Sequence, residues 1–175
     1  MTLDLYEHIR SVPDFPRKGI LFRDITTLLK DPAALRAAAD SLAEPFRSQN
    51  CRYVVGIESR GFIFGAIMAE QLGAGFVPVR KPGKLPAATH RRSYTLEYGS
   101  DAVEIHADAV KPGDPVVVHD DLLATGGTAM ATVELLRELG AEIVGVSFLI
   151  ELTFLQGRNK LAGYPVYSVL QYGAE

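Results

Sequence analysis

The chain has 175 residues, an apolar fraction of 47% and a mean hydropathy of +0.10, which together indicate one soluble domain with a sizeable core. Its formal net charge of −3 argues against a general nucleic-acid or anionic-membrane surface, and no apolar run approaches the ~18 residues of a membrane span. Because Cys51 is the only cysteine and the first residues lack the pattern of a signal peptide, we expect no intrachain disulfide and a cytoplasmic location.

The first third of the chain is predicted to hold two helices separated by an irregular stretch. Residues 3–12 place apolar side chains at helical spacing, and the prolines that follow stop the pattern. Residues 13–26 mix aromatic, basic and acidic side chains without a period. A second helix should begin at Asp31, whose carboxylate can cap the first turn ahead of a favourable proline, and should end or kink at Pro45.

A βαβ unit follows. Residues 53–57 predict a buried strand, residues 62–72 predict an apolar helix closed by Gly73, and residues 75–80 predict another strand. Strands and helices in this order indicate parallel strands joined by a right-handed crossover.

A basic loop and a hairpin are predicted next. Residues 81–92 contain Pro, Gly and basic side chains without a period, which predicts a mobile loop. Residues 94–98 and 102–106 flank a Gly-Ser turn and are typical of a hairpin. The segment 81–106, inserted into an α/β core, is therefore a candidate lid.

The stretch VVVHDDLLATGGTA, residues 116–129, organises the rest of the chain. Three valines predict a buried strand, Asp120 and Asp121 follow it, and the Thr-Gly-Gly-Thr turn leads into a helix over 129–139. Strands over 142–150 and 166–170 complete the pattern. The sequence therefore predicts an α/β fold, a doubly wound and mostly parallel sheet with helices on both faces, whose ligands bind at the carboxyl ends of the strands.

The chemistry of this stretch suits a sugar phosphate. Backbone N–H groups at a glycine-rich helix start attract phosphate, and two carboxylates can accept hydrogen bonds from ring hydroxyls. A Walker P-loop needs Gly-Lys-Ser/Thr and a dinucleotide site needs G-x-G-x-x-G, and neither motif occurs here. The bland alternative is a strand-turn-helix corner with capping threonines and surface aspartates.

The motif DDLLATGGT resembles the phosphoribosyl-pyrophosphate (PRPP) motif of type I phosphoribosyltransferases. Four more segments are similar to the adenine phosphoribosyltransferase family in its order: FPRKGILFRDIT, ESRGF, RKPGKLP with YTLEYG, and VSFLIELTFLQGR. The resemblance covers nearly the whole chain. It implies one phosphoribosyltransferase domain over residues 1–175, with a base-binding hood at 1–30 and a catalytic loop and hairpin at 81–106.

The resemblance also implies roles for residues in each segment. Asp120 and Asp121 would hold the ribose, and Ala124, Thr125, Gly126, Gly127 and Thr128 would hold the 5′-phosphate. The pyrophosphate would contact Glu58, Ser59, Arg60, Arg80, Lys81 and Lys84. Adenine would be bordered by Leu21, Phe22, Arg23 and Leu152, with the Leu21 main chain reading its exocyclic amine. Glu97 would be the catalytic acid or base, and Tyr98 would close over the substrates.

Simpler interpretations remain open for several of these residues. Phe22 and Leu152 could be plain core, and Glu97 an exposed strand residue. Lys81 and Lys84 could be solvated, as we expect more strongly for three neighbouring basic residues, His90, Arg91 and Arg92. We assign no role to 87–92. His119 departs from the apolar residue usual at the end of this strand, and we expect it to be packed or at the solvent edge rather than a metal ligand.

The function implied is the reaction of adenine with PRPP to give AMP and pyrophosphate, with Mg²⁺ bound mainly through PRPP and no dedicated protein ligand cluster. The family implies a homodimer, and we expect no nucleic-acid or membrane partner. Two alternatives stay open: a transferase for another base, such as a 6-oxopurine, and a PRPP-sensing regulator without catalysis. Regulators of that kind carry an added DNA-binding region, for which this acidic chain has no spare length.

Overall fold

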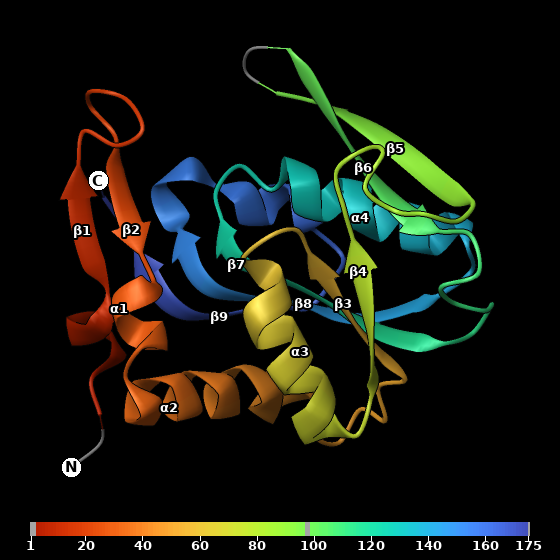
Figure 1. The fold of residues 1–175 in the computed structure, drawn as a ribbon, viewed down its shortest axis with the longest axis horizontal. Coiled ribbons are helices and arrows are strands. Elements are labelled where there is room, and N and C mark those ends of the chain that lie inside the picture. Colours follow the sequence, from red (N-terminus) through yellow and green to blue (C-terminus); the bar gives the residue numbers. More distant parts are fainter. Residues whose placement is uncertain (1–2, 97–98, 175) are drawn as a thin grey trace.

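The computed structural model describes residues 3–96 and 99–174, which contain a five-stranded parallel sheet in the order β4-β3-β7-β8-β9 (Figure 1). Its strands are β3 (Tyr53–Ile57), β4 (Gly75–Val79), β7 (Pro115–Leu123), β8 (Glu142–Leu152) and β9 (Val166–Tyr172). All the pairings between them are parallel, which confirms the predicted α/β sheet and the βαβ unit.

Helices cover both faces of this sheet, as predicted. Alternate valines of one strand serve the two sides, because successive side chains of a strand point to opposite faces. Val117 packs in a core with α2 (Pro32–Ala43) and α3 (Gly61–Leu72), whereas Val116 and Val118 pack in a core with α4 (Gly127–Glu138). Figure 1 shows α2 and α3 on one side of the sheet and α4 on the other.

The helix termini follow the sequence signals. The Asp31 carboxylate accepts a hydrogen bond from the Ala33 N–H at 2.8 Å, and α2 ends at Ala43, where the short η2 (Glu44–Phe46) contains the expected stop at Pro45. Gly73 closes α3 in the left-handed conformation with φ of 63°. None of the helices within the described ranges is long and apolar enough to cross a membrane.

The predicted helix over 3–12 is wrong. Only η1 (Leu5–His8) is helical, and the chain then extends into β1 (Arg10–Pro13), which pairs antiparallel with β2 (Leu21–Asp24). The predicted irregular stretch 13–26 is also wrong in part, because it contains β2 and the start of α1 (Thr26–Leu29). Pairing of the two strands outweighs the weak helical period of a short segment.

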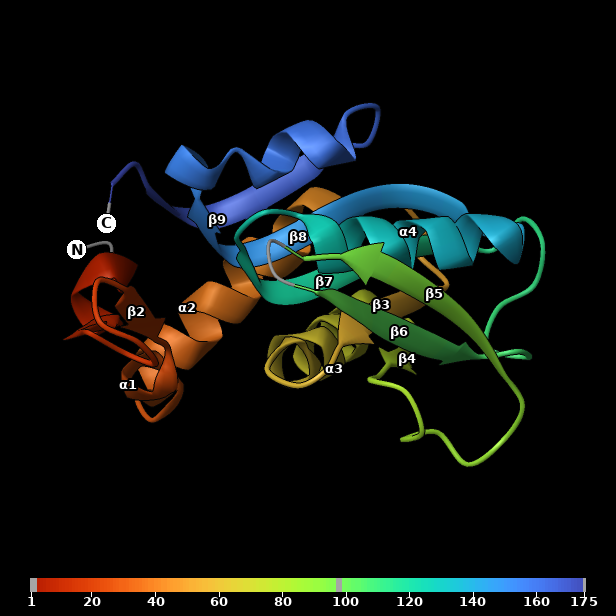
Figure 2. The same cartoon turned by 90° about the horizontal axis from the view of Figure 1, so that it is seen from above.

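This N-terminal unit, residues 3–29, packs beside the end of β9. The Tyr6 and Tyr172 rings meet edge to face at 5.5 Å between centroids, and the Gln171 N–H donates to the Tyr6 hydroxyl at 3.0 Å. Leu5, Ile9 and Leu28 join the core that α2 covers. Figure 2 shows the unit at one end of the molecule, next to the C-terminal strand.

The predicted hairpin is present, but its first strand begins earlier than expected. It consists of β5 (Thr89–Thr95) and β6 (Ser100–His106), so the predicted loop 81–92 ends at residue 88. Arg92 explains part of the difference, since it forms ion pairs with Glu134 and Glu138 and so holds β5 against α4. His90 and Arg91 are exposed, as expected. Figure 2 shows the hairpin lying along α4.

Candidate active site

A glycine loop, residues 124–128, connects β7 to α4 and forms the wall of a small cavity of about 80 Å³. Gly126 has a φ of 79°, a conformation that side chains with a Cβ rarely adopt. A Cβ there would lie 2.5 Å from the Gly157 carbonyl oxygen. The loop is therefore held between two backbones that have no room for a side chain.

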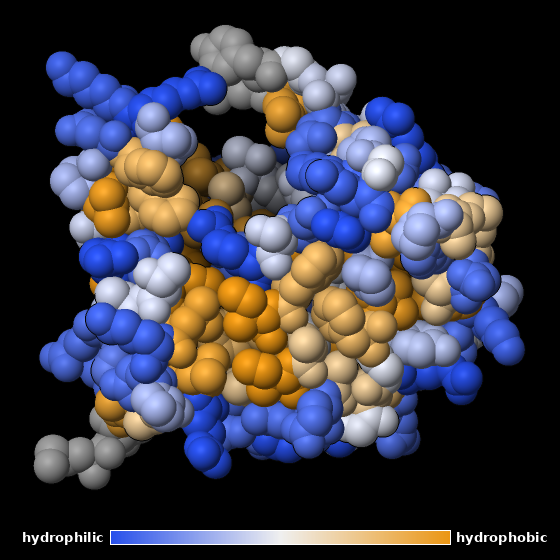
Figure 3. All heavy atoms as spheres, viewed as in Figure 1, coloured by the Kyte–Doolittle hydropathy of each residue, from blue (hydrophilic) through white to orange (hydrophobic). Residues whose placement is uncertain are grey.

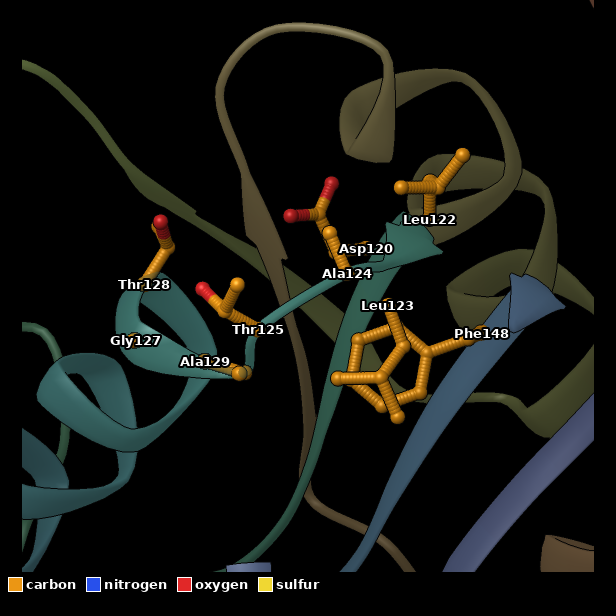
Figure 4. A pocket seen from close by; sticks show the side chains of 10 residues that line it. Asp120, Leu122, Leu123, Ala124, Thr125, Gly127, Thr128, Ala129 and Phe148 are labelled. Atoms are coloured by element: carbon orange, nitrogen blue, oxygen red, sulfur yellow. The ribbon is translucent and has the colours of Figure 1, made fainter. Parts of the chain in front are cut away.

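The polar groups of this loop face one side. Figure 4 shows the Asp120 carboxylate and the hydroxyls of Thr125 and Thr128 above the loop, and the Leu123 and Phe148 side chains beneath it. Among the residues that the structure describes, no side chain caps the N-terminus of α4. The first-turn N–H groups of a helix lack intrahelical partners, so the cavity can accept an anion.

The two aspartates after the β7 valines differ in their surroundings. The Asp121 N–H donates to Asp120 Oδ1 at 2.8 Å, and burial together with the neighbouring charge of Asp121 holds the pKa of Asp120 well above its usual range. Asp121 is 7% exposed, and its Oδ2 lies 2.6 Å from Arg60 Nε. The pair can thus supply several acceptors to a polyhydroxyl ligand.

A larger cleft of about 320 Å³ begins beside the aspartates. Three segments that are distant in sequence line it: Glu58, Ser59 and Arg60 after β3, Lys81 after β4, and Asp120, Asp121, Leu122 and Thr128 around the glycine loop. These segments lie at or just beyond the carboxyl ends of β3, β4 and β7, so the sheet topology brings these residues to one edge. Gly61 permits the approach, because a Cβ there would lie 3.0 Å from Asp120 Oδ1.

Glu58 and Arg80 form an ion pair just beyond the carboxyl ends of β3 and β4. Arg80 Nη2 donates to Glu58 Oε1 at 2.9 Å, and the Lys81 N–H donates to Glu58 Oε2 at 2.9 Å. The hydrogen bond from Arg80 is the main reason that the pKa of Glu58 lies below its usual value. Arg80 and Lys84 are not among the residues that line the cleft, and the Lys84 carbonyl accepts from Arg80.

An apolar pocket of about 420 Å³ lies between the N-terminal unit and Arg60. It is lined by Val12, Phe15, Phe22, Asp24, Thr26 and Arg60, and the Arg60 guanidinium lies 5.1 Å from the centroid of the Phe22 ring. Strand alternation turns Leu21 and Arg23 away from Phe22, and Arg23 lies 4.0 Å above the Tyr172 ring. Leu152 is half-buried at the end of β8 and packs against the core on the α2 side.

Sequence reasoning missed two polar residues next to the cleft. Tyr94 and Asp101 face each other across the hairpin, and both contact the Lys81 ammonium. The Thr128 hydroxyl also donates to the Tyr94 hydroxyl at 2.9 Å. The only sequence signal was their position in the predicted hairpin, which says nothing of what they contact. The predicted residues Glu97 and Tyr98 lie outside the described residues.

His119 is packed, as expected. It is fully buried, and its Nδ1 lies 3.3 Å from the Ser147 hydroxyl. Burial lowers the pKa of His119 to about 3, so the side chain is neutral at pH 7. Within residues 3–96 and 99–174, no group of three or more His, Cys, Asp or Glu side chains could hold a metal ion.

Comparisons with known proteins agree with this geometry. The model of the phosphoribosyl transferase domain matches residues 24–165. An adenine phosphoribosyltransferase of Acaryochloris marina is 60% identical over 170 residues, which are 97% of this chain and 100% of that protein. The crystal structure of the Rhodothermus marinus adenine phosphoribosyltransferase is 58% identical with a TM-score of 0.92, over 96% of both chains. The Saccharomyces cerevisiae adenine phosphoribosyltransferase, crystallised with an imino-altritol bisphosphate and adenine, is 42% identical with a TM-score of 0.89, over 95% of this chain and 96% of that chain.

Proposed function

This chain belongs to the adenine phosphoribosyltransferase family, and we propose that it transfers the phosphoribosyl group of PRPP to adenine N9, giving AMP and pyrophosphate. The reaction is a step of purine salvage, which we place in the cytoplasm. The observation that carries the proposal is the meeting of the glycine loop, the aspartate pair and the basic residues of the cleft at one edge of the sheet.

The glycine loop would hold the 5′-phosphate. Ala124, Thr125, Gly126, Gly127 and Thr128 line the small cavity, where helix N–H groups and two hydroxyls can donate to phosphate oxygens. Asp120 lines both that cavity and the cleft, and Asp121 lines the cleft. They would accept hydrogen bonds from the ribose hydroxyls and so orient C1′ toward the base pocket.

The pyrophosphate would lie in the cleft against Ser59, Arg60 and Lys81. The Glu58 carboxylate would orient Lys81 by accepting from the Lys81 backbone N–H, and it would hold Arg80 by accepting from its guanidinium. Lys84, in the loop after β4, would reach the pyrophosphate only as the loop closes. Mg²⁺ prefers oxygen ligands, which the polyphosphate itself offers beside the two aspartates, so we infer that it is bound mainly through PRPP. It would neutralise charge on the leaving pyrophosphate.

Adenine would enter the apolar pocket, which Phe22 lines and which shares Arg60 with the cleft. Its hydrogen bonds would come from main-chain groups near Leu21 and Arg23, and Leu152 would pack on the base from the sheet side. A main-chain carbonyl accepts and cannot donate, so this edge has a fixed polarity. Adenine matches that polarity, whereas hypoxanthine presents a carbonyl and an N1–H in reversed order.

The catalytic step is the attack of adenine N9 on C1′ as pyrophosphate leaves, through a transition state with oxocarbenium character and with inversion at C1′. Positioning and stabilisation of the leaving group would supply most of the rate. Glu97 would exchange a proton with the purine, and Tyr98 would close over the substrates. The hairpin would exclude water, which could otherwise hydrolyse PRPP.

The test is kcat/KM for adenine, hypoxanthine and guanine at saturating Mg-PRPP. We expect adenine to be preferred by roughly 10⁴-fold, because a wrong base would bury two mispaired polar groups. Comparable values for adenine and hypoxanthine would exclude the adenine assignment but leave the PRPP site intact. A melting temperature that Mg-PRPP does not raise would exclude that site as well, since ligand at a hundred times its Kd should add about 2.7 kcal/mol.

We further propose that the chain forms a homodimer through α3. That helix exposes Ile63 to 39%, and the neighbouring rings of Phe62 and Phe76 stack edge to face while remaining half-buried. Figure 3 shows an apolar patch over this part of the molecule. Apolar patches of this kind mark protein interfaces. Ile63→Glu should therefore shift the sedimentation coefficient to that of a monomer, whereas an unchanged dimer would place the interface elsewhere.

A further inference from the structure

The ammonium group of Lys81 has a partner within the chain. Lys81 is one of the residues that line the cleft, yet its Nζ bonds to the carboxylate of Asp101 and lies 3.2 Å from the Tyr94 hydroxyl. Asp101 is in β6 and is not among the cleft-lining residues. The Lys81 ammonium is thus directed toward the hairpin.

The Lys81 ammonium belongs to a hydrogen-bonded network with the side chains of Asp101, Tyr94 and Thr128. The Tyr94 hydroxyl donates to Asp101 at 3.2 Å and accepts from Thr128 at 2.9 Å. A phenol has one donor and two acceptor positions, so these bonds and the one from Lys81 use all of its capacity. The Ala102 N–H donates to the other Asp101 oxygen at 2.8 Å, which holds the carboxylate toward Lys81.

We propose that Asp101 competes with pyrophosphate for the Lys81 ammonium and so limits how tightly the pyrophosphate group is held. The inference rests on the proposed transferase function, and it assigns to Asp101 an influence that acts through Lys81 rather than by contact with substrate. In the absence of ligand the pair is neutral overall. A bound pyrophosphate must share or remove the lysine from Asp101, and that exchange weakens binding and favours release of the product.

The size of the effect follows from the exposure of the pair. The Lys81 and Asp101 side chains are 40% and 33% exposed, so water screens their attraction. Ion pairs of this kind contribute at most modestly, which corresponds to a change in affinity of about two- to fivefold. A carboxylate that merely lies on the same surface would repel every anion at long range, and its effect would not need Lys81.

The experiment compares Mg-pyrophosphate binding to the full chain by calorimetry at low ionic strength. Asp101→Asn retains the shape and the hydrogen bond to Ala102, and we expect it to tighten binding about two- to fivefold. Asp108→Asn makes the same change of net charge in the exposed turn after β6 and should leave the Kd unchanged. In a Lys81→Ala background, Asp101→Asn should have no further effect.

Steady-state kinetics supply a second measurement. A purely structural role of Asp101 would not alter inhibition by pyrophosphate while sparing the KM for adenine. Asp101→Asn should strengthen product inhibition by pyrophosphate by the same factor and leave the KM for adenine unchanged. Unchanged or weaker pyrophosphate binding in Asp101→Asn would overturn the inference, and so would equal tightening in the Lys81→Ala background. A wild-type chain that neither binds Mg-pyrophosphate nor forms AMP would instead overturn the proposed function.

Discussion

The glycine loop and the N-terminal unit border the two halves of the site, and different kinds of contact hold them in place. The glycine loop is five consecutive residues fixed by backbone approach, since Gly126 and Gly157 leave no room for a Cβ between them. The N-terminal unit is fixed by side chains, among them Tyr6 and Arg23 on Tyr172, and Arg10 on Asp24. The loop should therefore be sensitive to added volume, and the unit to changes of charge and aromatic contact.

Arg60 links the two regions. Its Nε pairs with Asp121 beside the glycine loop, and its guanidinium lies over Phe22 of the N-terminal unit. A planar guanidinium can make both contacts at once, which an ammonium cannot. A ligand in the cleft and a ligand in the apolar pocket would therefore both contact or border the Arg60 side chain.

The largest expected effect is that of Gly126→Ala. The alanine would have to adopt a left-handed φ, and its Cβ would lie 2.5 Å from the Gly157 carbonyl oxygen, so the loop must shift. We expect kcat/KM for PRPP to fall by about 100-fold or more, which is about 3 kcal/mol. Gly19→Ala in the N-terminal unit is the matched control, because Gly19 also has a positive φ of 89° but no atom within 4 Å of the added Cβ. Gly19→Ala should cost about 1 kcal/mol of stability and leave activity unchanged. Equal losses of kcat/KM in the two variants would contradict the comparison.

The second prediction concerns acid stability of the sheet next to the loop. In the folded chain the pKa of His119 is about 3, whereas the ordinary pKa of a histidine is 6.5. The unfolded chain binds more protons between these values, so His119 contributes stability that is complete above about pH 6.5 and is lost as the pH falls. The loss is up to ~1.4 kcal/mol per pH unit. Urea unfolding at pH 6 and pH 4 should show the wild-type chain losing about 2–3 kcal/mol more than His119→Leu. Parallel losses would mean that His119 is charged in the folded chain.

The third prediction separates the two halves of the site. Asp121→Asn removes a buried carboxylate that Arg60 contacts at 2.6 Å, and it should lower kcat/KM for PRPP by about 10- to 100-fold, or roughly 1–3 kcal/mol. Phe22→Leu keeps an apolar side chain but removes the ring, and it should raise the KM for adenine several-fold with little change in the KM for PRPP. If either variant changed the KM for adenine and the KM for PRPP by the same factor, Arg60 would couple the two regions more strongly than their separate contacts indicate.

The smallest effect concerns Asp24 in the N-terminal unit. The N–H of Thr26 and the Arg10 guanidinium lower the pKa of Asp24 to about 2, from 3.8. The stabilisation is therefore complete above about pH 3.8 and is lost as the pH falls through about 2. After allowance for solvent around the exposed Arg10, Asp24→Asn should cost about 1 kcal/mol at pH 7 and almost nothing below about pH 2. Arg10→Gln should remove only the part due to the ion pair, since the Thr26 hydrogen bond persists.

The accuracy of sequence-based prediction follows the same division between regions. The strands of the sheet and the helices α2, α3 and α4 were predictable, because buried valines, an aspartate N-cap and terminal glycines are local signals. The glycine loop and its aspartates were predictable because one contiguous segment carries the chemistry. The N-terminal strands were not, since Arg10 to Pro13 extends only by pairing with Leu21 to Asp24. The early start of β5 was missed for the same reason, as Arg92 is held by helix residues more than forty positions away.

The sequence by itself determined the parallel sheet, the edge at which ligands bind and the residues that form the glycine loop, because burial periods and backbone conformation are written in neighbouring residues. Only the tertiary structure decided the partners of the charged groups: Asp121 with Arg60, Glu58 with Arg80, and Lys81 with Asp101. Ion pairs depend on distances between segments that the chain order does not specify. The fold therefore decides how strongly each charged side chain can still bind a ligand, because it sets the partner with which the ligand must compete.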